Sequence, residues 1–315
     1  MPVGSADQGI GLWSGQVMLT IDNVSAHFDW QHEQIDESEP FDHKGNLLSY
    51  TLSPTFSIGI NNYWMLSLTQ HFGYRGMGWY VNENSKHHRT ENSTTDFINA
   101  IGGILGDTHF KLRYLVLNTG SMEGFRFFLG YGLIKPSKNT LTSDPFFLDG
   151  TEIDDHRHFK ISDGAYKSIY EVQLYKKQPY NPIFYGFSIK TILPMEVNKY
   201  GFKPSKYYEF SFTMLSSKIN SINGSIGFNF SLLNTTESYW NNFQSPNSKS
   251  TMLVTGFSFT KNLSKSSIII GIQKPFFLEG TLASTNEGDF KQSVNAIQLS
   301  IGYRQILNMS IPFLD

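Results

Sequence analysis

Charged residues recur within short runs whose alternate residues are apolar. Lys111 and Arg113, for example, take the polar positions of the alternating run 110–114. Because successive side chains of a β-strand point to opposite faces, such charges would gather on one face of a sheet. Neighbouring strands lie about 4.8 Å apart, so long side chains of opposite sign can pair between them. The candidates for this charged face are Lys111, Arg113, Arg126, Glu171, Lys190, Glu209 and Arg304.

Histidines form two short clusters in polar regions. His87 and His88 are adjacent, whereas His156 and His158 are two residues apart. Histidine is the commonest metal ligand, and the i, i+2 pair is the better candidate because adjacent extended residues diverge. Neither spacing is a recognised metal signature. We therefore expect solvated loop polarity or hydrogen bonds between loops, and neither a metal nor a cofactor.

Two phenylalanine pairs interrupt otherwise polar stretches. Exposed paired aromatics are costly in water, so we expect them to pack together, to fold over the mouth of the structure or to meet a partner. Packing within the protein is the preferred interpretation. The candidates for a loop constriction are Phe146, Phe147, His156, His158, Phe276 and Phe277.

Residue spacing gives no support to an enzyme. The chain has no G-x-S-x-G elbow, H-E-x-x-H pair or P-loop. Cysteine is absent, which excludes a disulfide framework and thiol-ligated metals. A net charge of -2 offers no basic face for nucleic acid. We expect no catalytic residues.

The elements that would position these residues are strands. Segments with apolar residues at every second position, bounded by turn residues, are typical of half-buried strands. About twelve such segments occur, at 16–30, 48–60, 64–80, 108–117, 125–134, 166–176, 182–193, 205–215, 224–233, 251–261, 266–274 and 295–305. Most are close to the roughly 9–11 residues that a tilted strand needs to cross a membrane.

The connectors between these segments alternate between short and long. Residues 61–62 and 262–265 make short links, whereas 81–107, 135–165 and 275–293 make long ones. Membrane-spanning barrels have short periplasmic turns and long outward loops. The sequence therefore predicts an all-β fold, a closed antiparallel transmembrane β-barrel of about twelve strands. An even strand count places both chain ends on the same side.

Composition favours a barrel whose apolar face meets lipid. Apolar residues make up 39% of the chain and its mean hydropathy is -0.28. No apolar run approaches the roughly 18 residues of a membrane helix. Aromatic residues nevertheless reach 15%, which fits the aromatic belts of lipid-embedded barrels. A soluble secreted β-sandwich is the alternative fold.

No linker, charge block or low-complexity tract divides the chain, so we expect one barrel domain over residues 1–315. Residues 1–15 would form an N-terminal periplasmic segment, and residues 306–315 a C-terminal tail. Residues 1–11 lack the basic and apolar parts of a signal peptide. We therefore expect a processed chain in the outer membrane of a Gram-negative bacterium.

Short glycine and proline motifs carry a family resemblance. They are Gly106-Asp107, the run 129–137 (LGYGLIKPS), Ser162-Asp163-Gly164, and the run 272–275 (IQKP). Together they resemble outer-membrane barrels of a transporter-like family associated with phenol-degradation meta-pathways. Ser137 stands where a family glycine is common, and the chain end lacks a terminal aromatic strand end. The resemblance implies outer-membrane location and barrel architecture more than it implies a substrate.

Two functional readings follow for such a barrel. In the first, the barrel passes or binds small polar or aromatic solutes, its lumenal charges act as charge rings do in channels, and its loops constrict the mouth. In the second, charge pairs fill a sealed lumen and the long loops bind a surface partner or neighbouring copies. Twelve strands lie between small filled barrels and large water-filled ones, so the strand count leaves both readings open. Outer-membrane lipid is the expected partner in each.

Overall fold

The computed structural model describes residues 11–34, 42–79, 90–120, 123–151, 153, 155–246, 248–280, 282–283, 292–311 and 314. His87 and His88 lie outside the described residues. The twelve long strands are β1 (Gln16–His32), β2 (His43–Gly59), β3 (Trp64–Trp79), β5 (Leu105–Asn118), β6 (Gly124–Lys135), β7 (Lys167–Lys177), β8 (Phe184–Pro194), β10 (Tyr207–Leu215), β11 (Ser225–Thr235), β14 (Ser250–Asn262), β15 (Ser266–Glu279) and β16 (Gln292–Ser310).

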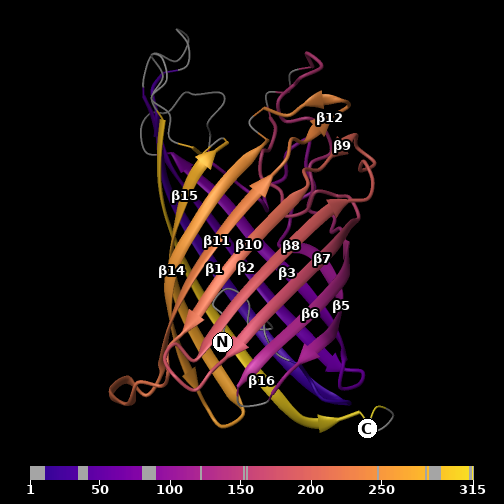
Figure 1. Ribbon diagram of the computed structural model, residues 1–315. Helices are drawn as coiled ribbons and strands as arrows, with labels where there is room; N and C mark the ends of the chain where they lie inside the picture. Colours follow the sequence, from indigo (N-terminus) through magenta and orange to yellow (C-terminus); the bar gives the residue numbers. More distant parts are fainter. Residues whose placement is uncertain are drawn as a thin grey trace.

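These strands form one closed sheet. Each pairs antiparallel with its neighbours in chain order, β1 pairs with β16, and the pairing of β2 with β3 completes the barrel (Figure 1). With the two-residue strand β4 (Glu91–Asn92) on β3, they make the 13-stranded sheet. The closed antiparallel barrel of about twelve strands predicted from the sequence is confirmed.

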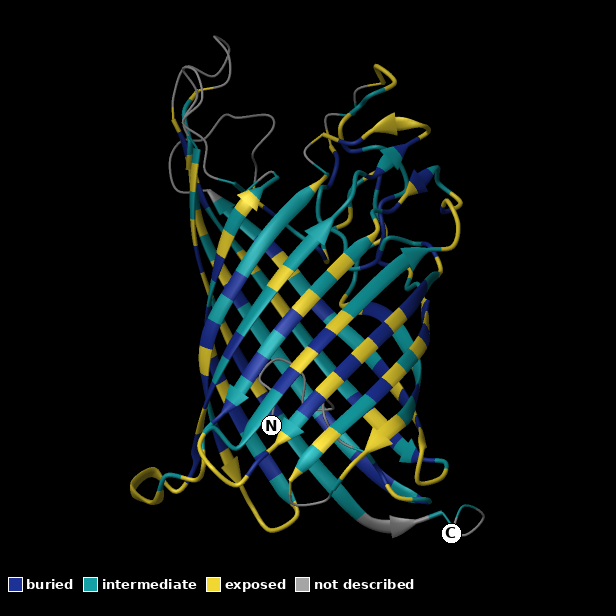
Figure 2. Ribbon diagram, in the orientation of Figure 1, coloured by how far each residue is buried: buried dark blue, intermediate teal, exposed yellow. Residues whose placement is uncertain are grey.

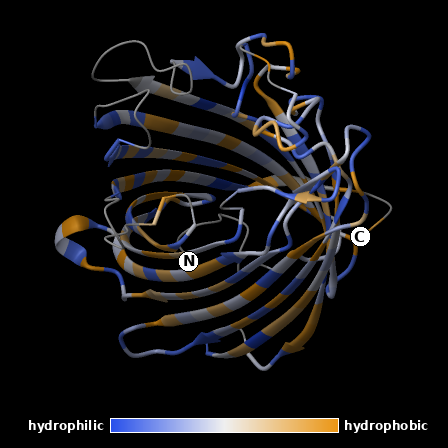
Figure 3. Cartoon of the chain, turned by 90° about the horizontal axis from the view of Figure 1, so that it is seen from above, coloured by the Kyte–Doolittle hydropathy of each residue, from blue (hydrophilic) through white to orange (hydrophobic). Residues whose placement is uncertain are grey.

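The barrel is apolar on its outer face and polar on its inner face. Along β7, the side chains of Tyr170, Val172 and Leu174 are exposed, whereas those of Glu171 and Gln173 are buried. Figure 2 shows this alternation as bands along the strands, and Figure 3, from above, shows polar and apolar residues alternating around the ring. A globular barrel would show the opposite arrangement, whereas lipid requires this one. Among the described residues, no helix is long and apolar enough to cross a membrane.

Small hydroxyl side chains pair across strands on the inner face. Thr55 and Thr69 approach to 2.7 Å between their hydroxyl oxygens, and Ser57 and Ser67 to 2.8 Å. These pairs join β2 to β3 directly opposite in the register. Within these two pairs each buried hydroxyl has a partner, so these four groups avoid the cost of an unsatisfied buried polar group.

The two ends of the barrel differ in connector length. Short turns close one end, hereafter the short-turn end: in one of them, Asn61 accepts hydrogen bonds from the backbone of Tyr63 and Trp64, both at 2.8 Å. The start of the first long strand and the end of the last meet there, and the Ile311 N–H donates to the Gly15 carbonyl at 3.2 Å. The opposite, long-loop end carries the extended connectors.

The long loops contain a small sheet of their own. It comprises β9 (Phe202–Lys203), β12 (Tyr239–Trp240) and β13 (Phe243–Gln244), and β9 and β12 stand above the barrel wall (Figure 1). Buried Phe202 and Trp240 pack together with Leu141. The intermediate loop 195–203 and the long loop 234–249 are thus joined by backbone pairing as well as by an apolar cluster.

β15 and β16 continue past the C-terminal ends predicted for them, residues 274 and 305. β15 continues through Pro275 to Glu279, paired with β14, so Phe276 and Phe277 lie in a strand rather than in the predicted loop. β16 runs to Ser310, so residues 306–310 belong to the wall and not to the predicted tail. In both places the neighbouring strand offers free backbone groups, and continued pairing satisfies them.

Candidate functional site

A row of charges lines the inner wall from β5 to β10. Arg113 on β5 and Glu171 on β7 form an ion pair of 2.9 Å, and their side chains are 3% and 7% exposed. Gly130 on β6 stands opposite both residues in the sheet register. Since glycine has no side chain, the guanidinium can reach over β6 to the carboxylate.

A second ion pair continues the row. Lys190 on β8 stands opposite Glu171 on one side and Glu209 on the other, and its Nζ lies 2.5 Å from Glu209 Oε2. Tyr207 donates its hydroxyl to the same Glu209 oxygen at 2.8 Å. The charges therefore alternate in sign along the row from β5 to β10, in the order Arg113, Glu171, Lys190 and Glu209, with Gly130 on β6 between the first two.

The other predicted inner-wall charges lie outside this row. Arg126 faces inward on β6 near the short-turn end, opposite Asn118 and Tyr175. Lys111 also faces inward on β5, two residues before Arg113 in the chain. Arg304 lies on β16 in the opposite wall, between Thr20 and Ser267 in the register. The structure thus brings four of the seven predicted charges into one row.

Lys111 has histidine neighbours on the inner wall. On β3, Nδ1 of His71 shares a hydrogen bond of 2.8 Å with the Ser53 hydroxyl. The other ring nitrogen of His71, Nε2, lies 3.3 Å from Nδ1 of His109. The two rings meet edge to face, with centroids 4.2 Å apart. No group of three or more metal-ligating side chains occurs within the described part of the chain.

A cavity of about 660 Å³ lies at the long-loop end, above this wall. It is hereafter the mouth cavity. Its lining combines charged residues with aromatic ones, and Asp163 is its one carboxylate among the described residues. The lining residues used below are Arg75, Lys160, Asp163, Lys167, Phe202 and Trp240.

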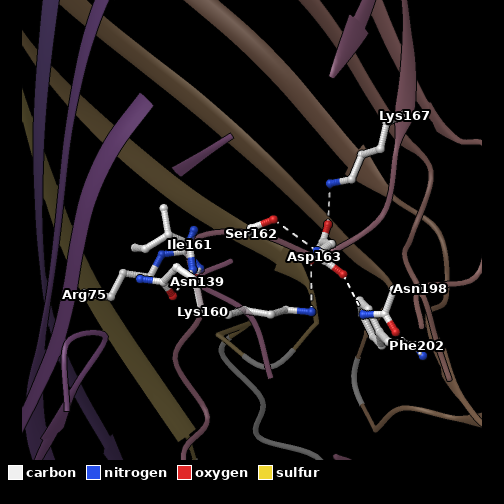
Figure 4. A network of polar contacts seen from close by, with 10 residues as sticks. Arg75, Asn139, Lys160, Ile161, Ser162, Asp163, Lys167, Asn198 and Phe202 are labelled. Atoms are coloured by element: carbon white, nitrogen blue, oxygen red, sulfur yellow. Dashed lines mark hydrogen bonds and ion pairs between the residues drawn. The ribbon is translucent and has the colours of Figure 1, made fainter. Parts of the chain in front are cut away.

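Asp163 holds two lysines in the mouth cavity. Lys160 Nζ lies 2.9 Å from Asp163 Oδ1, and Lys167 contacts Oδ2, so the two ammonium groups reach one carboxylate from different sides (Figure 4). Burial opposes ionisation of this carboxyl, but the ammonium groups outweigh burial and lower the pKa of Asp163 below its ordinary value. Burial lowers the pKa of Lys160, and Asp163 offsets only part of that effect.

Arg75 supplies a further cation. Its guanidinium donates to the Lys160 carbonyl at 3.1 Å, and it lies on the side of Lys160 away from Lys167 (Figure 4). Within the described residues, no carboxylate lies within ion-pair distance of Arg75. The lining therefore carries three cations against one carboxylate.

Arg157 fixes the loops around the cavity. Its side chain is fully buried, and its guanidinium donates to the carbonyls of Ser93, Thr95 and Ile101 at 2.6, 3.2 and 2.8 Å. Its backbone N–H donates to Asn99 at 2.8 Å. One side chain thus joins the loop after β6 to the loop before β5. Burial lowers the pKa of this guanidinium below its ordinary value.

Four of the six predicted constriction residues come together beside the mouth cavity. The rings of Phe147 and His156 lie 4.6 Å apart, those of Phe146 and His158 lie 6.0 Å apart, and the two histidine rings meet at 4.8 Å. Phe146 and His158 line the cavity. The imidazoles interact with each other, through ring nitrogens 3.1 Å apart.

Phe276 and Phe277 lie away from that cluster. Phe276 faces outward and is exposed, whereas Phe277 packs against Phe28 on the inner side of the wall, with ring centroids 5.9 Å apart. Their place in β15 explains the difference, because alternate strand residues point to opposite faces. They therefore take no part in a constriction with Phe146.

Sequence reasoning missed most of the mouth cavity. The alternation of segment 64–80 puts Arg75 on the polar face with Thr69 and His71, so this residue could have been found. In the sequence, Asp163 stands out only as part of the short motif Ser162-Asp163-Gly164. Lys160 and Arg157 lie in an irregular loop, where no periodicity indicates what a side chain contacts.

No protein-family description and no curated protein sequence matches the chain. Among solved structures, it is similar to an outer-membrane channel from Pseudomonas putida F1, with a TM-score of 0.63 and 9% identity over 97% of this chain and 100% of that one. The translocator domain of the autotransporter NalP from Neisseria meningitidis superposes with a TM-score of 0.41 and 9% identity, over 95% of this chain and 90% of that one. The Pseudomonas putida toluene transporter TodX superposes with a TM-score of 0.40 and 10% identity, over 92% of this chain and 89% of that one.

At sequence identities of 9% to 10%, these comparisons show a similarity of fold and no more. The first superposition spans both chains, and it supports a barrel of the type found in outer-membrane channels. The other two superpose too loosely to support an argument.

Proposed function

We propose that this barrel is an outer-membrane channel that admits small solutes through a charged lumen. One observation carries the proposal: the closed sheet is apolar outside and polar inside. Phe210 is 39% exposed on the outer face, whereas Asn229, on the inner face of the neighbouring strand, is 2% exposed. Exposed apolar side chains around a whole barrel are stable against acyl chains, and a charged interior is suited to water and solute.

The charged row gives the proposed pathway a selective element. Ions of both signs face the interior between β5 and β10, whereas the inner faces of β2, β11 and β14 carry mainly small neutral groups such as Ser57, Asn229 and Ser258. A solute in the lumen would therefore meet most of these charges on one side, and Arg304 on the other. Fold likeness to an outer-membrane channel agrees with this proposal.

Conductance in planar bilayers tests the channel. Folded protein should migrate faster on SDS gels when unheated than when boiled, and this form should give discrete current steps after reconstitution. Folded samples that never conduct would reject the channel.

The alternative is an anchored barrel whose loops bind a partner at the surface. The loop packing favours it, because Arg157 and the sheet of β9, β12 and β13 hold the loops over the mouth. Deleting residues 140–160 separates the two functions: in a channel the deletion changes an existing conductance, whereas in a sealed barrel it creates the first conductance.

A further inference from the structure

The inner wall below the mouth cavity carries more positive than negative charge. Nearer the long-loop end, one cation and one carboxylate, Lys167 and Asp107, act on each other and add nothing to the balance. Below them, five cations and three carboxylates face inward within the described part of the wall, which leaves two positive charges unmatched. The cations are Lys111, Arg113, Arg126, Lys190 and Arg304, and the carboxylates are Asp22, Glu171 and Glu209.

The unmatched charges belong to two arginines. The two ion pairs of the charged row neutralise four of the eight groups, and Lys111 and Asp22 each interact with other residues. Asp22 is the inward carboxylate nearest to Arg304 in the register, but it stands opposite Gly302 and forms no ion pair with the arginine. Among the described residues, neither Arg126 nor Arg304 has an ion pair or a hydrogen bond.

Arg304 lies among small uncharged side chains. It stands between Thr20 on β1 and Ser267 on β15, both of which are buried. Arg304 itself is half-buried, and Nη1 is its one nitrogen that is fully covered. The other edge of the guanidinium, which carries the Nε and Nη2 donors, is therefore open to the lumen and has no acceptor from the described residues.

An arginine in this position needs an acceptor from outside the protein. A guanidinium does not lose its proton in proteins, and a partly buried charge without a partner costs free energy. Water supplies an acceptor but no opposite charge. An oxyanion supplies both, because the parallel Nε–H and Nη2–H donors match two oxygens of one carboxylate or phosphate group.

Arg126 places the second unmatched charge near the short-turn end. It lies two residues from the start of β6, and its neighbours in the register, Asn118 and Tyr175, are uncharged. It lines a cavity of about 470 Å³ there. A solute that travels along the lumen would therefore meet an unpaired guanidinium on β16 and another on β6.

We infer that Arg304 binds small oxyanions in the lumen, and that Arg304 and Arg126 together make the channel select anions over cations. The ligand class is a small solute with a carboxylate or phosphate group, since these groups offer two oxygens to one guanidinium. The inference rests on the proposed channel function and adds to it the charge of the solute.

Thermal unfolding in non-ionic detergent tests oxyanion binding without transport. The midpoint, followed by tryptophan fluorescence, is measured at pH 7 in sodium acetate, sodium phosphate and sodium chloride of equal ionic strength. A ligand that binds only the folded state stabilises it, so the better oxyanion should raise the midpoint by about 2 °C or more over chloride. The larger of the acetate and phosphate shifts identifies the preferred group.

Variants locate the binding. Arg304→Gln should remove the difference between oxyanion and chloride, and Arg304→Lys should reduce it, because the charge remains but the paired donors do not. Lys265→Gln is the matched control: it removes the same charge from an exposed turn at the short-turn end and should keep the full difference. Equal differences in Arg304→Gln and Lys265→Gln would overturn the site.

Reversal potentials across a bilayer with a tenfold KCl gradient test the selectivity. The unchanged protein should prefer chloride, each of Arg304→Gln and Arg126→Gln should lose part of that preference, and the double variant should lose it. Lys265→Gln should retain it. A preference for potassium in the unchanged protein would overturn the selectivity.

Failure of the site and failure of the channel are distinguishable. An oxyanion shift that depends on Arg304, in protein that does not conduct, rejects the channel and retains the site. Conductance without anion preference, in protein whose midpoint is the same in oxyanion and chloride, rejects the inference and retains the channel.

Discussion

Arg113 and Glu171 lie two strands apart and form a buried ion pair of 2.9 Å across Gly130. A Cβ atom at residue 130 would come within 3.0 Å of Glu171 Oε2 and 3.1 Å of Glu171 Cβ. Any larger residue at this position would press on the carboxylate. The ion pair between Arg113 on β5 and Glu171 on β7 therefore requires a glycine at residue 130 on the strand between them.

Glu171→Gln should destabilise the barrel. The substitution removes the charge that Arg113 contacts, and breaking a buried ion pair by changing one partner costs on the order of 3–5 kcal/mol. The midpoint of thermal unfolding, followed by gel shift after incubation at each temperature, should fall. Because the double variant Arg113→Gln/Glu171→Gln removes both charges, it should recover part of the loss. A midpoint equal to that of the unchanged protein would show that the pair contributes nothing.

Substitutions at the second ion pair should shift ion selectivity in opposite directions. Glu209→Gln leaves Lys190 without its nearest carboxylate and should favour anions, whereas Lys190→Gln should favour cations. The reversal potential across a bilayer with a KCl gradient measures both. Shifts of the same sign in the two variants would contradict a lumenal position for this pair. Lys249→Gln is the control, because Lys249 lies exposed beside Glu279.

Arg157→Met should loosen the loops and leave the strands intact. Methionine preserves much of the apolar stem but supplies no donors to the carbonyls of Ser93, Thr95 and Ile101. Each buried polar group left without a partner costs about 1–3 kcal/mol. Chymotrypsin should cut the loop 138–163 faster, while the barrel fragment stays resistant. Unchanged cleavage would argue against Arg157 as the group that joins these loops.

The contacts of Asp163 should persist at acidic pH. Its pKa in the folded protein lies below the ordinary value of about 3.9. A carboxyl with a lowered pKa stabilises the fold fully above the ordinary pKa, and that contribution is lost as pH falls through the folded pKa. Trp240 fluorescence, obtained by subtracting the spectrum of Trp240→Phe, should therefore stay constant to pH 4 and change only below it. A transition centred between pH 5 and 6 would contradict this assignment.

Charge on the outer face should hinder insertion into lipid. Phe257 is 61% exposed there, level with Phe228 on the next strand, and an arginine on the lipid face near the bilayer midplane costs roughly 2–4 kcal/mol. Phe257→Arg should therefore lower the yield of folded protein in vesicles. Ser231→Arg, whose side chain faces the interior, is the control. Equal yields for Phe257→Arg and the unchanged protein would argue against a lipid-facing position.

Much of the barrel could be predicted from the sequence because strand alternation is local. Apolar residues at every second position are enough to assign Glu171 to one face and Tyr170 to the other. The same rule placed Arg113, Lys190 and Glu209 on the inner face. The rule does not give the position of each residue along the barrel axis, because that position depends on the register between strands. It therefore groups Arg126 with residues that lie further from the short-turn end.

The mouth cavity could not be predicted in the same way. Lys160 and Arg157 belong to a connector whose path is set by contacts with residues far away in the chain, such as Ser93, which lies 64 positions before Arg157. Phe277 illustrates a different limit. The prediction ends the strand at Lys274 and places Phe277 in the loop that follows, yet pairing with β14 carries the strand on to Glu279.

The seam between β1 and β16 joins the first long strand to the last along almost the entire length of β1, from Gln16 opposite Ser310 to His32 opposite Gln292. Its partners are 260 to 294 residues apart in the chain, so this pairing carries the greatest loop-closure entropy of the fold. Closure therefore requires the first and the last long strand to meet. Until they do, β1 and β16 each keep an open edge with unpaired backbone groups, and a chaperone that shields such edges would act before the seam forms.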